Sequence, residues 1–440
     1  MLSIRSDKIL EIVGSRSQVN ECVIDNVVTD SRVARKGDLF VALKGEKFDG
    51  HDFVSNVIES GVELVLVDHC IDGVSSQKQI VVDDTLKAYG LLGAYNRSLF
   101  KGKVIGLTGS AGKTTTKEEI KFLLSKFGKV YATSGNYNNQ VGVPLTLCQL
   151  DMSADFAVIE MGMSAKGEIA DLVSYVKPDV AVVTNVYPMH IEFFENFEGI
   201  AEAKAEIFQG LKKGGFAVIN EDTNFADVLE KRALENGAKV VKFGKNCLKD
   251  YHFETAEEGE HHIYNALCAL KVLEVLGLDA KKAQAFIKDF GALDGRGKKW
   301  TLSFAKGKYV LIDDSYSGQP ESMKLAIENL SKMKTSGRKI AVLGKMAELG
   351  ETSRARHEEI GKFLALSNID VVVGVCPETK DVLAQLPDKM ETYYFENKDG
   401  LDDFLLNKLL QNNDNVLIKG ARYSSKLYQV AESLIKQGAV

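Results

Sequence analysis

The sequence predicts an α/β protein in which helices cover mostly parallel sheets. Short runs rich in β-branched residues alternate with helical patterns along the 440 residues, which is typical of strands joined by crossover helices. In addition, an apolar strand at 104–107 runs through a Gly/Ser loop into a helix-forming segment, the order that a phosphate-binding loop requires. The expected strands are residues 64–67, 80–82, 104–107, 156–159, 180–183, 216–219, 309–312, 340–343, 371–374 and 416–418.

Two polar stretches indicate where the chain divides. The stretch 96–103 is polar and basic and precedes the strand of the Gly/Ser loop. The stretch 291–299 is Gly-rich and basic, and a new strand–loop–helix series begins after it. We therefore expect three domains, at 1–101, 102–297 and 298–440, which suits a rule of roughly 100–200 residues per domain.

Composition narrows the class of protein. The chain is 45% hydrophobic and 26% charged, which is ordinary for a soluble globular protein. A net charge of −6 argues against nucleic acid as the main partner. The first ten residues contain no signal-peptide core, no apolar run approaches the ~20 residues of a membrane span, and the six cysteines are scattered. We expect a cytoplasmic protein without membrane insertion, and a monomer.

The segment around residue 112 is the most informative one. Backbone N–H groups in such a loop, together with the positive end of the next helix, hold phosphate oxygens. Lys113 would reach the outer phosphates and the Thr114 hydroxyl would bind Mg²⁺. Leu107 stands where the general nucleotide loop has its first Gly, so this is a shorter form; a plain Gly-rich turn is the alternative. The candidate phosphate-binding residues are Gly109, Ser110, Ala111, Gly112, Lys113, Thr114 and Thr115.

Two strand ends in the central domain carry further candidates. Glu160 follows the strand 156–159, and ligands of doubly wound sheets bind at the carboxyl ends of strands, so its carboxylate suits a hard cation. His190 lies in a loop beyond Thr184-Asn185, which end the strand 180–183. The simpler alternatives are a solvated Glu160 and a surface or packing role for His190.

Lys204 lies on the apolar stripe of an expected helix at 198–212. Ile200, Ile207, Phe208 and Leu211 share its face, which is the face that packs on a core. The lysine either extends its head to water beside neighbouring glutamates or is buried. Burial lowers a lysine pKa, and a neutral amine reacts with carbon dioxide to form a carbamate. The periodicity leaves both accounts open.

Other polar clusters have structural and functional interpretations. The loop containing Asn136, Asn138 and Asn139 is rich in residues that also favour turns. Asp313-Asp314 end the strand 309–312 and would accept hydrogen bonds from a ribose or cap a helix. His261-His262 lack a second ligand pair with zinc spacing, so we do not expect zinc there.

These segments together resemble the Mur ligases, the ATP-dependent ligases of peptidoglycan synthesis, over nearly the whole chain. The shorter phosphate loop is typical of such amide-forming ligases. The most specific motifs are S-G-N-Y-N-N-Q-V-G-V-P at 134–144, A-K-A-E-I-F at 203–208, D-D-S-Y-S-G-Q-P-E-S-M at 313–323 and V-L-G-K-M-A-E-L-G at 342–350. In the first domain, T-D-S-R at 29–32, G-D-L-F-V-A-L-K-G at 37–45 and D-G-H at 49–51 look like the region that binds the UDP-sugar.

The resemblance implies a P-loop-type central ATP-binding domain, flanked by a small N-terminal UDP-MurNAc-binding domain and a C-terminal Rossmann-like ligase domain. It implies ATP and two Mg²⁺ ions, with Thr114 and Glu160 at the first ion and His190 and a carbamylated Lys204 at the second. Lys113, Lys204, His190 and Arg296 would be catalytic, with Arg296 at the γ-phosphate, Asn265 at the adenine and Asp314 at the ribose. The substrate-binding residues would be Asp30, Ser31, Arg32, Asp49, His51, Asn136, Asn138 and Asn139.

Within the family, the resemblance implies the addition of D-alanyl-D-alanine to UDP-N-acetylmuramoyl-tripeptide through an acyl phosphate. The alternative is addition of the third, diamino acid to the UDP-MurNAc-dipeptide, but the D-N-P-R motif of that ligase is absent. A guanine-type switch protein lacks support because no N-K-x-D occurs. Three residues depart from the family pattern: His262, Ser317 and Lys345. We expect an active ligase with altered ATP affinity, and the alternative is a binding protein without catalytic activity, the silent binding protein.

Overall fold

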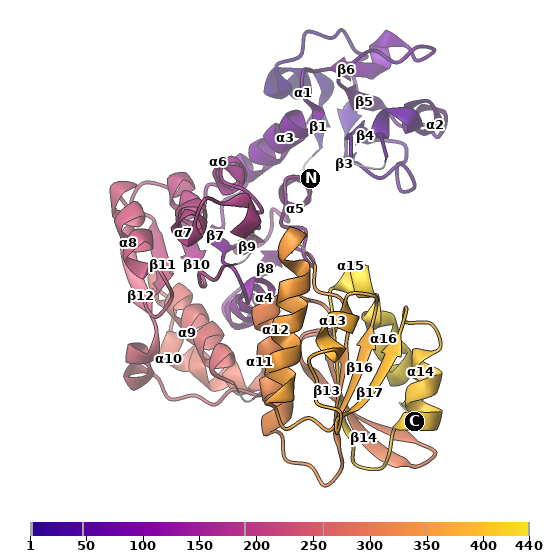
Figure 1. Cartoon of the computed structure of the whole chain (residues 1–440). Coiled ribbons are helices and arrows are strands. Elements are labelled where there is room, and N and C mark those ends of the chain that lie inside the picture. The colour runs from indigo at the N-terminus through magenta and orange to yellow at the C-terminus, as the bar shows by residue number, and fades with distance from the viewer. Residues whose placement is uncertain (1–2, 46–47, 189–190, 258, 348, 439–440) are drawn as a thin grey trace. The chain divides into compact units, whose positions relative to one another are not determined.

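The computed structural model (Figure 1) describes residues 3–45, 48–188, 191–257, 259–347 and 349–438. The chain forms two compact units: Met1–Glu254 with Glu260–Ile287, and Thr255–Gly259 with Lys288–Val440. Parallel sheets with helices between their strands make up both units, so the expected α/β fold is confirmed. The domain boundaries after residues 101 and 297 stay predictions.

The first unit begins with an antiparallel pair, β1 with β2, and continues with a small parallel sheet of four strands in the order β3-β4-β5-β6. Leu39 and Leu64 face one apolar cluster, and Phe40 and Val65 face another. Both faces are therefore covered, which is why β4 and β5 are continuous apolar runs. The elements are β1 (Ile4–Arg5), α1 (Ser6–Val13), β2 (Val23–Ile24), β3 (Asn26–Val28), β4 (Asp38–Val41), η1 (Gly50–Phe53), α2 (Val54–Glu59), β5 (Leu64–Val67), η2 (Ser76–Lys78), β6 (Gln79–Val81) and α3 (Thr85–Leu99).

The same unit continues with a six-stranded parallel sheet in the order β12-β11-β10-β7-β9-β8. Its register pairs Thr108 with Val183 and Leu107 with Glu160, so three strands end side by side. The elements are β7 (Lys103–Thr108), α4 (Lys113–Leu124), β8 (Val130–Ala132), α5 (Gly142–Cys148), β9 (Phe156–Glu160), α6 (Glu168–Val176), β10 (Val180–Val183), η3 (Ile191–Phe193), α7 (Phe197–Ala205), η4 (Glu206–Gly210), β11 (Phe216–Asn220), α8 (Ala226–Glu235), β12 (Lys239–Phe243), η5 (Lys245–Asp250), α9 (Glu260–Val275), α10 (Ala280–Ala283) and η6 (Gln284–Asp289).

The second unit holds a six-stranded sheet in the order β13-β14-β18-β15-β16-β17. Only the edge strand β13 is antiparallel; the other neighbours are parallel. The elements are β13 (Lys298–Phe304), β14 (Gly307–Asp314), α11 (Pro320–Lys332), β15 (Lys339–Leu343), η7 (Gly350–Thr352), α12 (Ser353–Ala365), β16 (Val371–Val375), α13 (Thr379–Leu383), β17 (Glu391–Phe395), α14 (Leu401–Asp403), the π-helix η8 (Phe404–Leu409), β18 (Asn415–Lys419), α15 (Arg422–Ser425) and α16 (Leu427–Gly438).

All ten expected strands are confirmed within a residue or two. The strands that sequence analysis missed are short or lie at sheet edges, such as β12 and β17, where apolar patterns are weak. The expected helix 198–212 is wrong at its end, because α7 stops at Ala205 and a 3₁₀ segment follows. A β-carbon at Gly210 would lie 2.4 Å from Val173, so the chain here turns close against α6. Within the described ranges, no helix combines the length and the apolar character needed to cross a bilayer.

Two buried polar residues of α3 join the small sheet to the central one. Asn96 Nδ2 donates to the carbonyls of Leu147 and Cys148 at the end of α5. Arg97 donates from Nε to Val176 O at 2.8 Å and from Nη2 to Lys177 O at 2.9 Å. These side chains satisfy carbonyls at the ends of α5 and α6 that lack partners within their own helices.

Replacing Arg97 with Met should lower the free energy of unfolding by about 3 kcal/mol, because buried carbonyls lose charged donors. The measurement is urea denaturation of the full chain. Arg16→Met is the matched control: Arg16 is exposed, and its change should be within about 0.5 kcal/mol. An equal change in the free energy of unfolding for the two substitutions would contradict the conclusion that Arg97 stabilises the contact between the small sheet and the central sheet.

Candidate active site

The Gly/Ser loop connects β7 to the first turn of α4 and adopts a backbone that needs glycine. Gly112 has a φ of 76° and Gly109 a φ of 156°. A β-carbon at Gly109 would lie 1.9 Å from Thr184 Oγ1, so the loop backbone passes directly against the end of β10. Lys113 Nζ donates back to Gly109 O at 2.8 Å and to Ser110 O at 3.2 Å, which places its ammonium group over the loop.

The end of β10 holds the loop in place. Ala111 N–H donates to Asn185 Oδ1 at 2.8 Å, and Asn185 Nδ2 donates to Ala111 O at 3.0 Å. Thr184 Oγ1 donates to the same carbonyl at 3.0 Å, and Ser110 N–H donates to Asn185 O. The N–H groups of Ser110 and Ala111 are thus used inside the protein. Phosphate oxygens would instead meet the N–H groups of the first turn of α4, which includes Thr115.

Thr114 and Glu160, the two predicted ligands of the first cation, lie in contact, and their role as metal ligands stays a prediction. Thr114 Oγ1 lies 3.3 Å from Glu160 Oε1, which also accepts from Asn138 Nδ2 at 2.7 Å. Glu160 is 1% exposed, and its Oε2 has no hydrogen-bond partner among the described residues. The solvated alternative for Glu160 is therefore wrong: the carboxylate is buried at the carboxyl end of β9.

Lys117 is a buried cation that sequence analysis missed. Its Nζ donates to Thr133 O at 2.6 Å and to Gly135 O at 2.9 Å, and lies 3.8 Å from Glu160 Oε2. Its side chain is fully buried. The available signal was helical spacing, because Lys117 shares the buried face of α4 with Ile120 and Leu124. Through the Thr133 and Gly135 carbonyls, the Lys117 side chain connects the asparagine-rich loop to the buried carboxylate of Glu160.

The three asparagines of that loop differ in their contacts. Asn138 positions Glu160, as described above. Asn139 Oδ1 accepts from Gly142 N–H at 2.9 Å and so supports the start of α5. Asn136 is exposed and keeps its expected role in substrate binding as a prediction.

Lys204 in α7 is buried, which decides between the two accounts left open by its periodicity. It is 3% exposed, and within the described residues it makes no hydrogen bond or ion pair. The neighbouring glutamates have other partners: Glu202 binds Arg232, and Glu206 accepts from Gly167 and Ala170. Burial, reinforced by the positive charge of Lys113, holds the Lys204 pKa well below its ordinary value. His190 lies outside the described residues.

Asn265 in α9 lies close to the phosphate-binding loop because its side chain contacts the first turns of α4. Thr116 Oγ1 donates to Asn265 Oδ1 at 3.0 Å, and a β-carbon at Gly112 would lie 3.4 Å from the same oxygen. The amide of α9 is thereby brought beside the phosphate loop of α4. The neighbouring His261 and His262 rings lie 4.0 Å apart, centroid to centroid.

In the second unit, Asp314 ends β14, Arg296 precedes β13 and Lys345 follows β15. Asp314 Oδ2 forms an ion pair with the buried Lys419 at 2.8 Å. The Arg296 guanidinium lies 4.1 Å from the centre of the Tyr316 ring. Lys345, which departs from the family pattern, forms an ion pair with Glu378. The expected nucleotide contacts of Arg296 and Asp314 stay predictions.

The candidate residues of the small sheet form two groups. Arg32 forms an exposed ion pair with Asp30 and lowers its pKa to about 2, with part-exposed Ser31 between them. His51 Nδ1 lies 2.6 Å from Asp49 Oδ1, and its Nε2 accepts from Asp68 N–H at 3.2 Å. Asp30 and Asp68 follow β3 and β5 respectively, so these groups are near the carboxyl edge of the sheet.

Replacing Lys117 with Met should weaken binding of the magnesium–nucleotide complex about 10–100-fold, the range typical when a residue that orients a metal ligand is lost. Glu160 would lose its positive neighbour, and two loop carbonyls would lose their donor. Titration of the full chain with magnesium and nucleotide measures the effect. Lys121→Met is the control, because Lys121 lies on the same helix, pairs with the half-buried Glu118 and has no contact with Glu160 among the described residues. An equal loss in Lys121→Met would contradict the assignment.

Known protein families match three parts of the chain. The family described as "Mur ligase family, catalytic domain" matches residues 23–88, "Mur ligase middle domain" matches 107–261, and "Mur ligase, glutamate ligase domain" matches 302–422. The second of these regions contains the phosphate loop, Glu160 and Lys204.

Full-length relatives and solved structures agree with these matches. The chain is 33% identical to the UDP-N-acetylmuramoyl-tripeptide--D-alanyl-D-alanine ligase of Escherichia coli (strain K12) over 100% of both chains. It is 35% identical to the ligase of that name from Synechocystis sp., over 90% of this chain and 89% of the relative. MurF from Acinetobacter baumannii is similar in structure, with a TM-score of 0.87 and 28% identity over 99% of both chains. MurF from Thermotoga maritima, solved with ADP, has a TM-score of 0.78 and 29% identity over 94% of this chain and 97% of that one. The resemblance seen in the sequence is confirmed, and the chain belongs to the Mur ligase family.

Proposed function

We propose that this chain is an ATP-dependent ligase that joins D-alanyl-D-alanine to UDP-N-acetylmuramoyl-tripeptide. The observation that carries the proposal is the assembly of Lys113, Thr114 and Glu160 at one edge of the central sheet. Its support is the full-length similarity to ligases of that name. The alternative, addition of a diamino acid to the dipeptide, has less support, because structural similarity to such a ligase is limited to 18% identity and a TM-score of 0.55.

The reaction begins when the tripeptide carboxylate attacks the γ-phosphate of ATP. A carbon–oxygen–phosphorus linkage forms, ADP leaves, and the amine of the dipeptide then displaces phosphate and forms the amide. The main barrier is the repulsion between two anions, which cationic groups offset. Lys113 supplies such a charge, and the first turn of α4 supplies N–H groups for the phosphates.

The donor set at Glu160 fits a magnesium ion. A hard cation prefers carboxylate and hydroxyl oxygens, and a buried Glu160 Oε2 without a hydrogen-bond partner among the described residues beside the Thr114 hydroxyl provides them. When bound, magnesium would neutralise charge on the transferring phosphoryl group. Lys117 and Asn138 hold the carboxylate in position for it.

Lys204 is the residue expected to carry a carbamate at a second magnesium site. Its neutral amine would attack carbon dioxide, forming a nitrogen–carbon bond and releasing one proton, so that an uncharged side chain becomes an anion. Two features support the modification: the side chain is buried without a carboxylate partner among the described residues, and the nearby Lys113 disfavours a second ammonium group. A carbamate there would also neutralise part of the Lys113 charge.

Replacing Lys204 with Met should reduce turnover roughly 100-fold or more yet raise the melting temperature at pH 7. In the folded chain the Lys204 pKa lies well below its ordinary value of 10.5. Between those two values the unfolded chain binds a proton that the folded chain does not, so this residue opposes folding, and less so as pH rises. The stabilisation by Met should therefore shrink toward pH 10.5. Melting curves in buffer freed of carbon dioxide measure it.

Labelled bicarbonate provides a direct test of the carbamate. The parent chain should take up the label at one lysine, and Lys204→Met should not. Lys166→Met is a control on another lysine of the same unit. Uptake that is unchanged in Lys204→Met would contradict the modification.

The proposed activity is tested with purified chain, ATP, magnesium, UDP-MurNAc-tripeptide and D-alanyl-D-alanine, each omitted in turn. Phosphate release that needs both organic substrates and yields the pentapeptide nucleotide is the expected result. Release only with UDP-MurNAc-dipeptide and a diamino acid would select the alternative ligase. Nucleotide binding without release in either mixture would point to the silent binding protein.

A further inference from the structure

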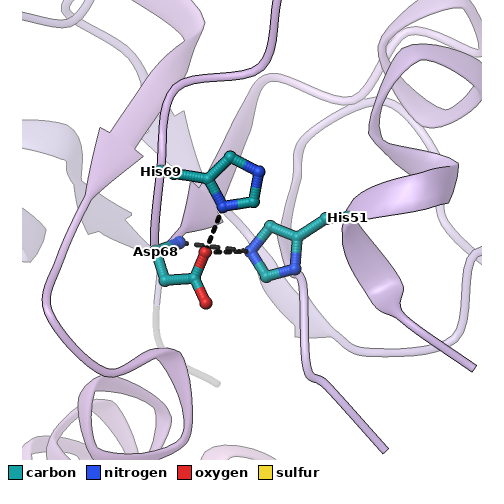
Figure 2. A group of neighbouring side chains, drawn as sticks. All are labelled: His51, Asp68 and His69. Atoms are coloured by element: carbon teal, nitrogen blue, oxygen red, sulfur yellow. Dashed lines mark hydrogen bonds and ion pairs between the residues drawn. The ribbon is translucent and has the colours of Figure 1, made fainter.

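Three side chains capable of binding metals converge at the carboxyl edge of the small N-terminal sheet. Asp68 and His69 directly follow β5, and His51 lies in the short η1 segment. Figure 2 shows one Asp68 carboxylate oxygen beside a ring nitrogen of His51 and a ring nitrogen of His69. Donor atoms of the three side chains all lie within 4.8 Å of one another.

The spacing of the donor atoms suits one small ion. His51 Nε2 lies 3.1 Å from Asp68 Oδ1, and His69 Nδ1 contacts the same oxygen. Metal bonds of about 2.1 Å in tetrahedral geometry place ligand atoms about 3.4 Å apart. The His51 and His69 rings stack, with centroids 4.9 Å apart and planes inclined by 23°, so the His69 ring has to turn before both nitrogen lone pairs meet one ion. Asp68 and His69 have the exposure to rotate, with side chains 39% and 62% exposed.

A carboxylate behind the buried histidine favours metal binding. His51 is 7% exposed, and Asp49 Oδ1 lies 2.6 Å from its Nδ1. An N–H donated from Nδ1 to Asp49 leaves the lone pair of Nε2 directed toward Asp68. Histidine ligands of metals very often donate their second nitrogen to a carboxylate in this way.

The hydrogen bonds of the cluster do not account for all of its contacts. The Asp68 N–H donates to His51 Nε2 at 3.2 Å, which is a long bond. With the proton on Nδ1, His51 Nε2 and Asp68 Oδ1 are two acceptors at 3.1 Å without a proton between them. A cation shared by the two atoms removes that repulsion, and the backbone bond it replaces is worth only about 1 kcal/mol.

We propose that His51, Asp68 and His69 form a binding site for one divalent transition-metal ion of the zinc or cobalt class. Two imidazoles and one carboxylate suit such ions and are a poor set for magnesium, which prefers oxygen ligands. The exposed side of the cluster leaves the remaining coordination positions to water. This site is separate from the phosphate loop, and it shares His51 and the supporting Asp49 with the residues expected to bind the UDP-sugar.

The test is titration of the full, untagged chain with Co²⁺ in excess magnesium, which occupies sites that prefer oxygen. Calorimetry gives the stoichiometry, and visible d–d absorption reports nitrogen ligands. One equivalent should bind, and His69→Ala and Asp68→Asn should each weaken binding at least about tenfold. His252→Ala is the control, because His252 is an exposed histidine outside the cluster.

Glu160→Gln separates this site from the nucleotide site, and Co²⁺ binding should be unchanged in that variant. Asp49→Asn should weaken binding about 10-fold if it supports His51 as argued. Equal Co²⁺ affinity in His69→Ala and the parent chain would overturn the proposal. So would binding lost only in Glu160→Gln, or no binding at millimolar Co²⁺, which would leave a proton as the shared cation.

Discussion

The close approach of the phosphate loop to the end of β10 is the constraint on which the candidate site depends. Gly109 leaves no room for a β-carbon beside Thr184, and Asn185 bonds both the N–H and the carbonyl of Ala111. These contacts exist because β7 and β10 are neighbours in the sheet with their carboxyl ends in register. The loop is thus fixed before a ligand arrives, which lowers the entropy cost of binding phosphate.

Buried charge is the second feature of the site. Lys117 and Glu160 lie in the core with their charges near one another, and Lys204 is buried with no opposite charge in contact among the described residues. Buried charges cost stability unless they are paired and hydrogen-bonded. Lys117 meets that condition through two carbonyls, whereas Lys204 does not. The proposed carbamate and a metal ion would together convert this buried amine into an anionic ligand.

Two of the three departures from the family pattern, Ser317 and Lys345, have local partners in the second unit, whereas His262 lies in α9 of the first unit. Lys345 pairs with Glu378, and Lys419 pairs with Asp314 while donating to Ser317 O. Neither pair removes a phosphate or metal candidate of the first unit. Ser317 and Lys345 therefore alter contacts after β14 and β15 and not the contacts of the phosphate loop or Glu160.

The sequence by itself determined the fold class, because apolar periodicity is a local property, and it determined the family through the resemblance of its motifs. The phosphate-binding role of the Gly/Ser loop follows from the same local pattern and stays a prediction. It also marked Lys204 as unusual, but could not distinguish an exposed ammonium from a buried amine. Only the tertiary structure decided that question, and it alone revealed Lys117, Asn185 and the cluster around Asp68. Burial and hydrogen-bond partners arise where segments distant in the sequence pack together: Lys117 meets the carbonyl of Thr133, and His51 meets the end of β5. Such contacts depend on strand order and register, which no short stretch of sequence specifies.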